Sequence, residues 1–312
     1  MALPASTLHT GIQIGRREDL SDVVYDISPT DTPFLSGVAR TKATGILHEW
    51  QTDSLATAAQ NAVVEGDEAT TDAATVTTRL SNSCQISDKV PRITGTAEAV
   101  NKAGRKSEMA YQVSKRAREL KRDMETGLLR NGAEATGDTT TARALGAVPA
   151  WVTTNSSVGT GGSDGSLGNT ARTDGTQRAF TEALLKTVVQ SCWDSGGDPD
   201  CLMLGSFNKQ AASTFTGNAT RFKGAEDAEL VAAIDVYNSD FGEFQIIANR
   251  FQRSRDAWLL QKDLWAVAYL RAFQLQDLSK TGDSERKQLL VEFSLESRNE
   301  AGSGIIADLT TS

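Results

Sequence analysis

The chain contains 312 residues, of which 39% are hydrophobic and 23% are charged, which is too apolar for a disordered chain. No apolar run reaches the roughly 18–20 residues of a membrane helix, and the first residues lack the features of a signal peptide, so we expect no membrane partner. The formal net charge of −8 disfavours a general attraction to nucleic acid. Three dispersed cysteines and two histidines indicate synthesis in a reducing cytoplasm and leave little material for catalysis.

The first 44 residues mix polar side chains with a few apolar ones. Pro29 and Pro33 both disfavour helix at the residue before them. We therefore predict an extended or turning arm over residues 1–44.

Two strands with a long polar connection are predicted next. Residue types alternate with a period of two from Gly45 to Thr52, and again over 76–86, where Val76 and Ile86 are expected on the same side as the other apolar residues. Residues 51–78 contain five acidic residues and no Lys or Arg. Because a two-stranded hairpin is marginally stable alone, we expect the tip to lie over a neighbouring subunit. The candidate inter-subunit contact residues are Trp50, Val63, Val64, Glu65, Asp67 and Glu68.

A long amphipathic helix is predicted from about Arg105 to Arg130. Apolar residues recur every three or four positions from Val113 to Leu128, and Asn131-Gly132 provides a helix stop. Between residues 101 and 130 nine basic residues stand against four acidic ones, a local charge of +5. Such a run is either a solvated face or a stripe that meets another subunit or a phosphate. The candidate basic face consists of Lys115, Arg116, Arg118, Lys121 and Arg122.

Residues 134–178 are rich in Gly, Ser and Thr. Leu145 and Trp151 are the large apolar anchors in this stretch, which predicts a surface excursion or a crossing between domains, outside the core. A helix is then expected from Phe180 to the stop at Gly196.

The remainder predicts a layered region of helices and strands. A short buried strand over 201–204 precedes a helix with Ser206 as its N-cap, and further strands are expected at 230–237, 244–248 and 258–261. Two long strands, 264–275 and 288–297, flank a turn at 280–283. In the second long strand Val291, Phe293 and Leu295 are expected to face one way and Glu292, Ser294 and Glu296 the other.

The sequence contains no recognisable catalytic or cofactor motif. No phosphate-binding loop, clustered metal ligands or nucleophile elbow is present, and His9 and His48 are isolated. The carboxylate pairs, such as Asp198 and Asp200, lie in polar segments typical of solvated turns. We therefore expect no enzyme activity, no metal and no cofactor.

Several phrases, in chain order, resemble one protein family. They are Asp26-Ile-Ser-Pro-Thr-Asp-Thr-Pro-Phe-Leu, Trp50-Gln-Thr-Asp-Ser-Leu-Ala, Ile93-Thr-Gly-Thr, Tyr111-Gln, Glu119-Leu-Lys-Arg-Asp-Met-Glu, Asp240-Phe-Gly, Lys280-Thr-Gly-Asp and Leu295-Glu-Ser-Arg-Asn-Glu-Ala-Gly. Together they are similar to the major capsid proteins of tailed double-stranded DNA bacteriophages. The resemblance implies an α+β chain with the Hong Kong ninety-seven capsid fold.

The parts of that fold are assigned here by the resemblance. They are an N-terminal arm (1–44), an extended E-loop hairpin (45–97), the spine helix and peripheral domain with the Gly/Ser/Thr-rich excursion (98–178), an axial domain (179–262) and strands returning to the peripheral domain (263–312).

The function implied by the resemblance is self-assembly into hexamers and pentamers of an icosahedral shell around double-stranded DNA. The protein would be made in the host cytoplasm and reside in the virion, and portal, scaffolding and decoration proteins are its further implied partners. Because the arm starts at residue 1, any scaffold is expected to be a separate protein. The alternative within the same fold is an encapsulin-like nanocompartment shell. A DNA-binding regulator is disfavoured by the net charge and by the absence of a helix-turn-helix or zinc motif.

Overall fold

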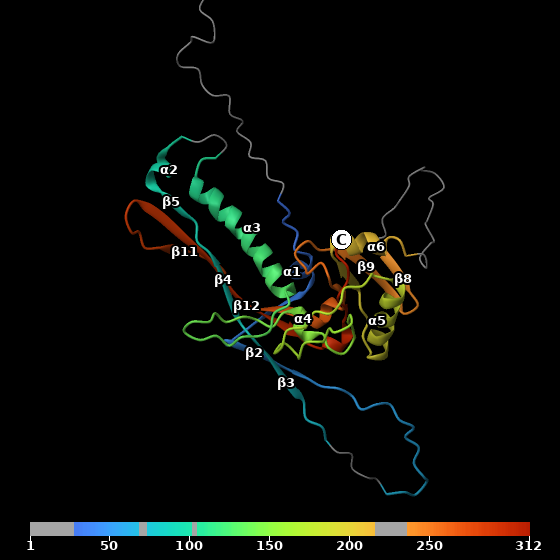
Figure 1. Cartoon of the computed structure of the whole chain (residues 1–312). Coiled ribbons are helices and arrows are strands. Elements are labelled where there is room, and N and C mark those ends of the chain that lie inside the picture. Colours follow the sequence, from blue (N-terminus) through green and yellow to red (C-terminus); the bar gives the residue numbers. More distant parts are fainter. Residues whose placement is uncertain (1–27, 69–73, 102–104, 216–235) are drawn as a thin grey trace, which may run out of the picture.

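The computed structural model describes residues 28–68, 74–101, 105–215 and 236–312. Its strands form a five-stranded sheet, a six-stranded sheet and a separate two-stranded hairpin. Figure 1 shows the long helix α3 (Glu108–Leu129) running beside the strands of the five-stranded sheet, while the loop of the hairpin extends away from the body. The chain therefore has the α+β architecture that the sequence predicts.

The five-stranded sheet is built around two 14-residue strands. These strands, β11 and β12, pair antiparallel, β1 joins the outer side of β11 in parallel, and β4 and β5 both pair with β12. A short helix, α2 (Gly95–Ala99), follows β5. The strand bounds are β1 Ala39–Lys42, β4 Gln85–Lys89, β5 Arg92–Thr94, β11 Trp265–Leu278 and β12 Ser284–Ser297.

The helix α3 packs on one face of this sheet. Its first turn is capped by Ser107, whose hydroxyl oxygen accepts a hydrogen bond from the backbone N–H of Ala110. Leu120, Met124 and Leu128 are buried in the same cluster as the β12 residues Val291 and Phe293. The predicted apolar face of the helix is thus confirmed.

The six-stranded sheet has the order β6-β13-β10-β7-β9-β8. The helices α5 (Glu182–Asp194) and α6 (Ser206–Ala212) share a buried cluster with one face of this sheet, which includes Leu202 and Leu259. The strand bounds are β6 Ser156–Ser157, β7 Cys201–Leu204, β8 Val236–Ser239, β9 Gly242–Ala248, β10 Ala257–Leu260 and β13 Gly304–Ile306, and two 3-10 turns lie at Lys262–Leu264 and Glu300–Gly302.

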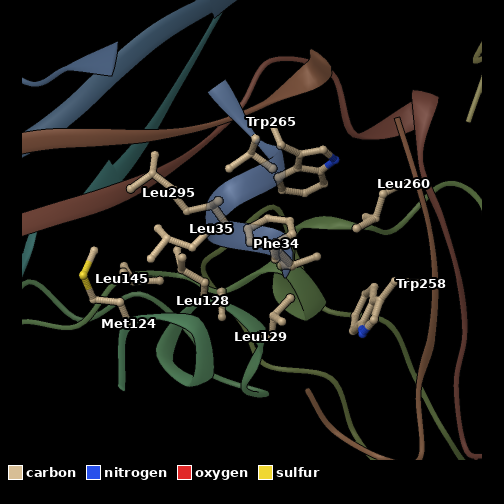
Figure 2. Packing of buried hydrophobic residues seen from close by; sticks show 14 of the residues in the cluster. Phe34, Leu35, Met124, Leu128, Leu129, Leu145, Trp258, Leu260, Trp265 and Leu295 are labelled. Carbon is tan, nitrogen blue, oxygen red and sulfur yellow. The ribbon is translucent and has the colours of Figure 1, made fainter. Parts of the chain in front are cut away.

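The other face of the six-stranded sheet meets the core under α3. Figure 2 shows Trp258 and Leu260 of β10 gathered around the same hydrophobic centre as Phe34 of the short helix α1 (Pro33–Gly37) and Met124 of α3. The two sheets therefore share one continuous core, with α1 at its centre.

The end of the arm contains a short helix, which the prediction of an extended or turning segment does not include. Helix α1 begins at Pro33, and β1 follows it as an edge strand of the sheet. Proline is compatible with the first helical position, where its missing N–H has no intrahelical partner, while Thr32 before it stays outside the helical region. The rest of the predicted arm, 1–27, lies outside the described residues.

The Gly/Ser/Thr-rich excursion also differs from its prediction. Residues 145–152 enter the core, where Val148–Trp151 forms the short helix α4 and both Leu145 and Trp151 are buried. Gly146 permits this burial, because a Cβ atom there would lie 2.7 Å from the carbonyl oxygen of Gly168.

Several smaller predictions need correction. Val76 is exposed because it lies before the start of β3 (Thr78–Ser83), and Ile86 is exposed because the alternation breaks at Cys84, between β3 and β4. Ser206 is the first residue of α6, and Gly205 occupies the N-cap. Most of the strand expected at 230–237 lies outside the described residues.

The polar face of β12 is not solvated. Glu292, Ser294 and Glu296 do alternate with the apolar residues, yet all three are buried. The hairpin covers this face at Ser294 and Glu296, and the segment around Arg143 covers it at Glu292.

Candidate assembly surfaces

The hairpin formed by β2 (Leu47–Thr52) and β3 is fixed to the body through Asn82. This fully buried side chain donates to the carbonyl oxygens of Leu295 (2.8 Å) and Gly146 (3.0 Å), and its own carbonyl accepts the backbone N–H of Gly146 (2.8 Å). Ser294 adds hydrogen bonds to the backbone oxygens of Asn82 and Ser83. Satisfied buried hydrogen bonds of this kind specify a single orientation for the hairpin base.

Trp50 and His48 complete the attachment of the hairpin. The indole N–H of Trp50 donates to the carbonyl oxygen of Ser297 (2.7 Å), and its ring lies 5.3 Å from that of Trp151. The Nε2 atom of His48 lies 2.9 Å from Glu296, whose pKa is lowered to about 2, chiefly by this hydrogen bond. The structure thus places Trp50, a candidate inter-subunit residue, against its own subunit.

The loop beyond the strands has no apolar cover in the described part of its own chain. Exposed fractions are 98% for Leu55, 71% for Val63, 77% for Val64 and 91% for Val76. The three predicted acidic contact residues of the tip are exposed as well: Glu65, Asp67 and Glu68. Apolar side chains gathered on a projecting loop indicate a surface that meets another protein.

The base of the hairpin crosses the face of β12 that is opposite to α3. Side chains of successive residues in a strand point to opposite faces. In β12, Val291 and Phe293 pack in the core that contains α3, whereas Ser294 and Glu296 hydrogen bond with the hairpin. The base of the hairpin therefore crosses the face of β12 opposite to α3, while Trp50 and Leu80 also reach the edge of the core cluster that contains α3.

The five basic residues predicted on the helix have different environments. Arg116 pairs with Glu119 (2.5 Å), and the guanidinium of Arg122 lies over the ring of Phe251. The remaining three are exposed along the helix: Lys115, Arg118 and Lys121. We call these three residues the basic strip.

Two buried carboxylates were missed by sequence reasoning. Glu125, fully buried in α3, accepts hydrogen bonds from the backbone N–H groups of Phe34 (2.9 Å) and Leu35 (2.8 Å) and from the amide of Asn249 (2.7 Å). Burial raises the pKa of Glu125 above its ordinary value, although the three hydrogen bonds from Leu35, Phe34 and Asn249 act to lower it.

The second buried carboxylate belongs to β12. Glu292 binds Arg143 and Arg271, each at 2.7 Å, and thereby holds the segment containing Arg143 against the sheet. No signal in the sequence identifies either carboxylate, because an isolated Glu in an otherwise regular helix or strand pattern is normally a surface residue.

The described residues offer no assembled catalytic or metal centre. They contain no group of three or more His, Cys, Asp or Glu side chains arranged to hold a metal ion. Burial raises the pKa of Cys84 to about 11 and those of Cys192 and Cys201 to about 12, which keeps these thiols protonated and unreactive. Among the described segments, no helix has both the length and the apolar character that a membrane crossing requires.

The fold is that of phage capsid subunits. The chain is similar to a subunit in the capsid asymmetric unit of Cyanophage A-1(L), with a TM-score of 0.69 and 13% identity over 95% of this chain and 98% of that one. It is also similar to a subunit of the native GTA particle capsid, with a TM-score of 0.66 and 10% identity over 98% of this chain and all of the other. These likenesses establish the fold as that of the Hong Kong ninety-seven type.

The family follows from the sequence. The model of the SU10 major capsid protein family matches residues 5–310, so the chain belongs to this family. The major capsid protein of Escherichia phage Phieco32 is 26% identical to it over 335 aligned positions that cover 94% of each chain. The chain is therefore a major capsid protein of a tailed phage, which confirms the resemblance drawn from the sequence, and the encapsulin alternative is not favoured.

Proposed function

We propose that this protein is made in the host cytoplasm and assembles into hexamers and pentamers of an icosahedral shell that encloses double-stranded DNA. One observation carries the proposal: the hairpin loop exposes Leu55, Val63, Val64 and Val76 with no cover from the described part of its own chain. Burying such side chains stabilises an assembly by up to about 1.5–3 kcal/mol each. A neighbouring subunit supplies the cover, and its repetition over many copies produces a shell.

The presence of two separate larger sheets and a hairpin supports an assignment of residue ranges to the parts of the capsid fold. We assign 1–44 to the arm, 45–97 to the E-loop, 98–178 to the spine helix and peripheral domain, 179–262 to the axial domain and 263–312 to the returning strands. β4 and β5 pair with β12, so the freely projecting part of the E-loop ends at β3. The strand β13, at the other end of the chain, adds to the six-stranded sheet of the axial domain.

The proposed inner surface of the shell carries the basic strip. The hairpin base crosses the face of β12 opposite to α3. A hairpin that covers a neighbour on the outer surface of the shell would therefore leave the basic strip of α3 on the inner surface. Three positive side chains per subunit are suited to non-specific contact with phosphate, and they carry no base-reading geometry. No catalytic step is part of the proposed function.

Further proteins of the particle are proposed partners. A similar structure from Phage G consists of major capsid proteins and decoration proteins, and its TM-score to this chain is 0.53. For this chain, decoration, portal and scaffolding proteins are partners that the capsid function requires or accommodates.

The experiment that tests the proposal is expression of the chain followed by sedimentation and electron microscopy of the purified product. Closed shells built from capsomers are the expected result. A uniform monomer at high protein concentration, both alone and with the phage's own scaffolding protein, would contradict the proposal.

A further inference from the structure

Two aromatic side chains of the axial domain stack on each other at the surface. Trp193, near the end of α5, and Phe241, in the turn between β8 and β9, have ring centroids 5.2 Å apart. Their exposed fractions are 56% and 40%, whereas the other four tryptophans of the chain are buried or half-buried. Exposed, paired aromatic rings are the usual centre of a protein–protein contact.

Acidic side chains surround this aromatic pair. Asp194 follows Trp193 in the chain, and Asp240 and Glu243 flank the turn of Phe241. Asp198 lies close to the same turn, because a Cβ atom on Gly242 would be 3.6 Å from its carboxylate. None of the four exposed carboxylates forms an ion pair within the described residues. We call the two rings and four carboxylates the aromatic–acidic patch.

The opposite end of the same sheet carries a complementary surface. β7 and β9 run parallel, so the patch lies at their amino ends and the residues that follow them lie at their carboxyl ends. There Arg250 is exposed and forms no ion pair within the described ranges, and Phe207 of α6 is 37% exposed. The backbone N–H of Asn249 donates to the carbonyl oxygen of Leu204, which places the segment of Arg250 beside the start of α6.

We propose that the aromatic–acidic patch of one copy binds the surface around Arg250 and Phe207 of the adjacent copy in a capsomer. Four unpaired carboxylates favour a basic partner, and a guanidinium over an indole face gains a cation–π contribution. Two complementary surfaces at opposite ends of one domain join copies head to tail, and such contacts generate closed rings when the rotation between copies closes. This inference rests on the proposed function and identifies one of its contacts.

Charge exchange tests the contact. Asp240→Arg and Arg250→Asp, each alone, place like charges across the interface and are expected to reduce the fraction of protein in capsomers and shells at least tenfold. The variant with both substitutions restores opposite charges and is expected to recover assembly. The matched control is Asp31→Arg, which makes the same change of charge at an exposed position. Asp31 forms no ion pair among the described residues and is distant in sequence from both proposed surfaces.

The aromatic pair is tested separately. Trp193→Ala is expected to reduce assembly while leaving circular dichroism and the Tm unchanged, and Trp193→Phe is expected to retain most of it. If the Asp240→Arg variant does not fold, Asp198→Arg is combined with Arg250→Asp in the charge-exchange experiment instead.

Two results would overturn the inference while the wild-type chain still forms shells. One is full assembly by both single charge variants, and the other is failure of the paired exchange to restore assembly lost in folded single variants. Failure of the wild-type chain itself to assemble would instead count against the proposed function.

Discussion

Removal of the Glu125 carboxylate leaves three N–H groups without an acceptor in a site that water does not reach. Glu125→Ala is therefore expected to lower the free energy of unfolding by about 3 kcal/mol. This is the usual cost when buried hydrogen-bond donors lose a carboxylate acceptor and gain no other partner. Urea unfolding followed by circular dichroism measures the change. Thr126→Ala, at the exposed neighbouring position, is the control and is expected to change stability by less than about 0.5 kcal/mol. Equal stability of the two variants would show that the hydrogen bonds of Glu125 contribute nothing.

Glu296 makes the stability of the protein depend on acid pH. Its pKa is about 2 in the folded chain, against 4.5 as the ordinary value, because His48, Arg298 and Thr41 hydrogen bond to the ionised form. A depressed pKa gives stabilisation that is complete above about pH 4.5 and is lost as the pH falls toward 2. Glu296→Gln is expected to remove roughly 2–3 kcal/mol of stability at pH 6 and little at pH 2.5, as measured by urea unfolding at both values. An identical loss at the two pH values would contradict this origin of the stability.

Leu120 tests the contact between α3 and the core. Leu120→Asp places a carboxylate without a partner in a site that is 1% exposed, so a loss of several kcal/mol and of soluble yield is expected. Ser114→Asp introduces the same side chain at an exposed position of the same helix, and normal yield and Tm are expected. Normal shells from Leu120→Asp would show that this face of the helix is not buried.

Whether the role of a single residue can be predicted from the sequence depends on how near in the chain its contacting residues lie. The apolar face of α3, including Leu120 and Met124, could be predicted because helix periodicity fixes which residues share a side. The roles of Glu125 and Asn82 could not, because each binds residues far away along the chain; Asn82 and Leu295 are 213 positions apart. Only the folded topology brings such partners together.

At the scale of elements, the hairpin loop is the part whose role depends most on neighbours. Replacing residues 54–75 by a short Gly-Ser turn removes Leu55, Val63 and Val64 and leaves the base contacts of Trp50 and Asn82 intact. A soluble, folded subunit with unchanged helix content that forms no shells is the expected result, measured by circular dichroism and sedimentation. The matched control replaces Val63 and Val64 by Thr, which keeps the loop length and is expected to weaken assembly without abolishing it. Closed particles from the deletion would show that the loop is dispensable.

Element prediction succeeds where side-chain periodicity is strong and fails where composition is the main signal. Both long strands and the helices α3 and α5 are predicted within a few residues. The excursion 134–178 is predicted as surface because Gly, Ser and Thr dominate it, yet residues 145–152 are core. Small residues permit close backbone approach, as at Gly146, and composition does not distinguish that use from flexibility.

At the scale of the whole molecule, the net charge of −8 combines an acidic hairpin loop with a basic strip on α3. The acidic residues Glu65, Asp67 and Glu68 are exposed on the projecting loop, and the three residues of the basic strip are exposed on α3. Under the proposed function, a shell with the basic strip on its inner surface would offer three positive side chains per subunit for non-specific contact with phosphate. The alternative interpretation, in which the charge run pairs with acidic loops of neighbouring subunits, predicts a different salt dependence of empty shells.

Salt dependence distinguishes phosphate contact from a solvated face. Each phosphate that a Lys or Arg neutralises contributes about −0.9 to the slope of log K against log salt concentration, so replacing Lys115, Arg118 and Lys121 by Gln is expected to make the slope for DNA binding by capsomers less steep by about 2–3. Arg79→Gln removes one exposed charge from the hairpin side and is expected to leave the slope unchanged. The same triple variant is expected to leave the salt stability of empty shells at the wild-type value, because no subunit contact is lost. An unchanged DNA slope would mean that the strip only faces water, and weakened empty shells would mean that it pairs with a neighbouring subunit after all.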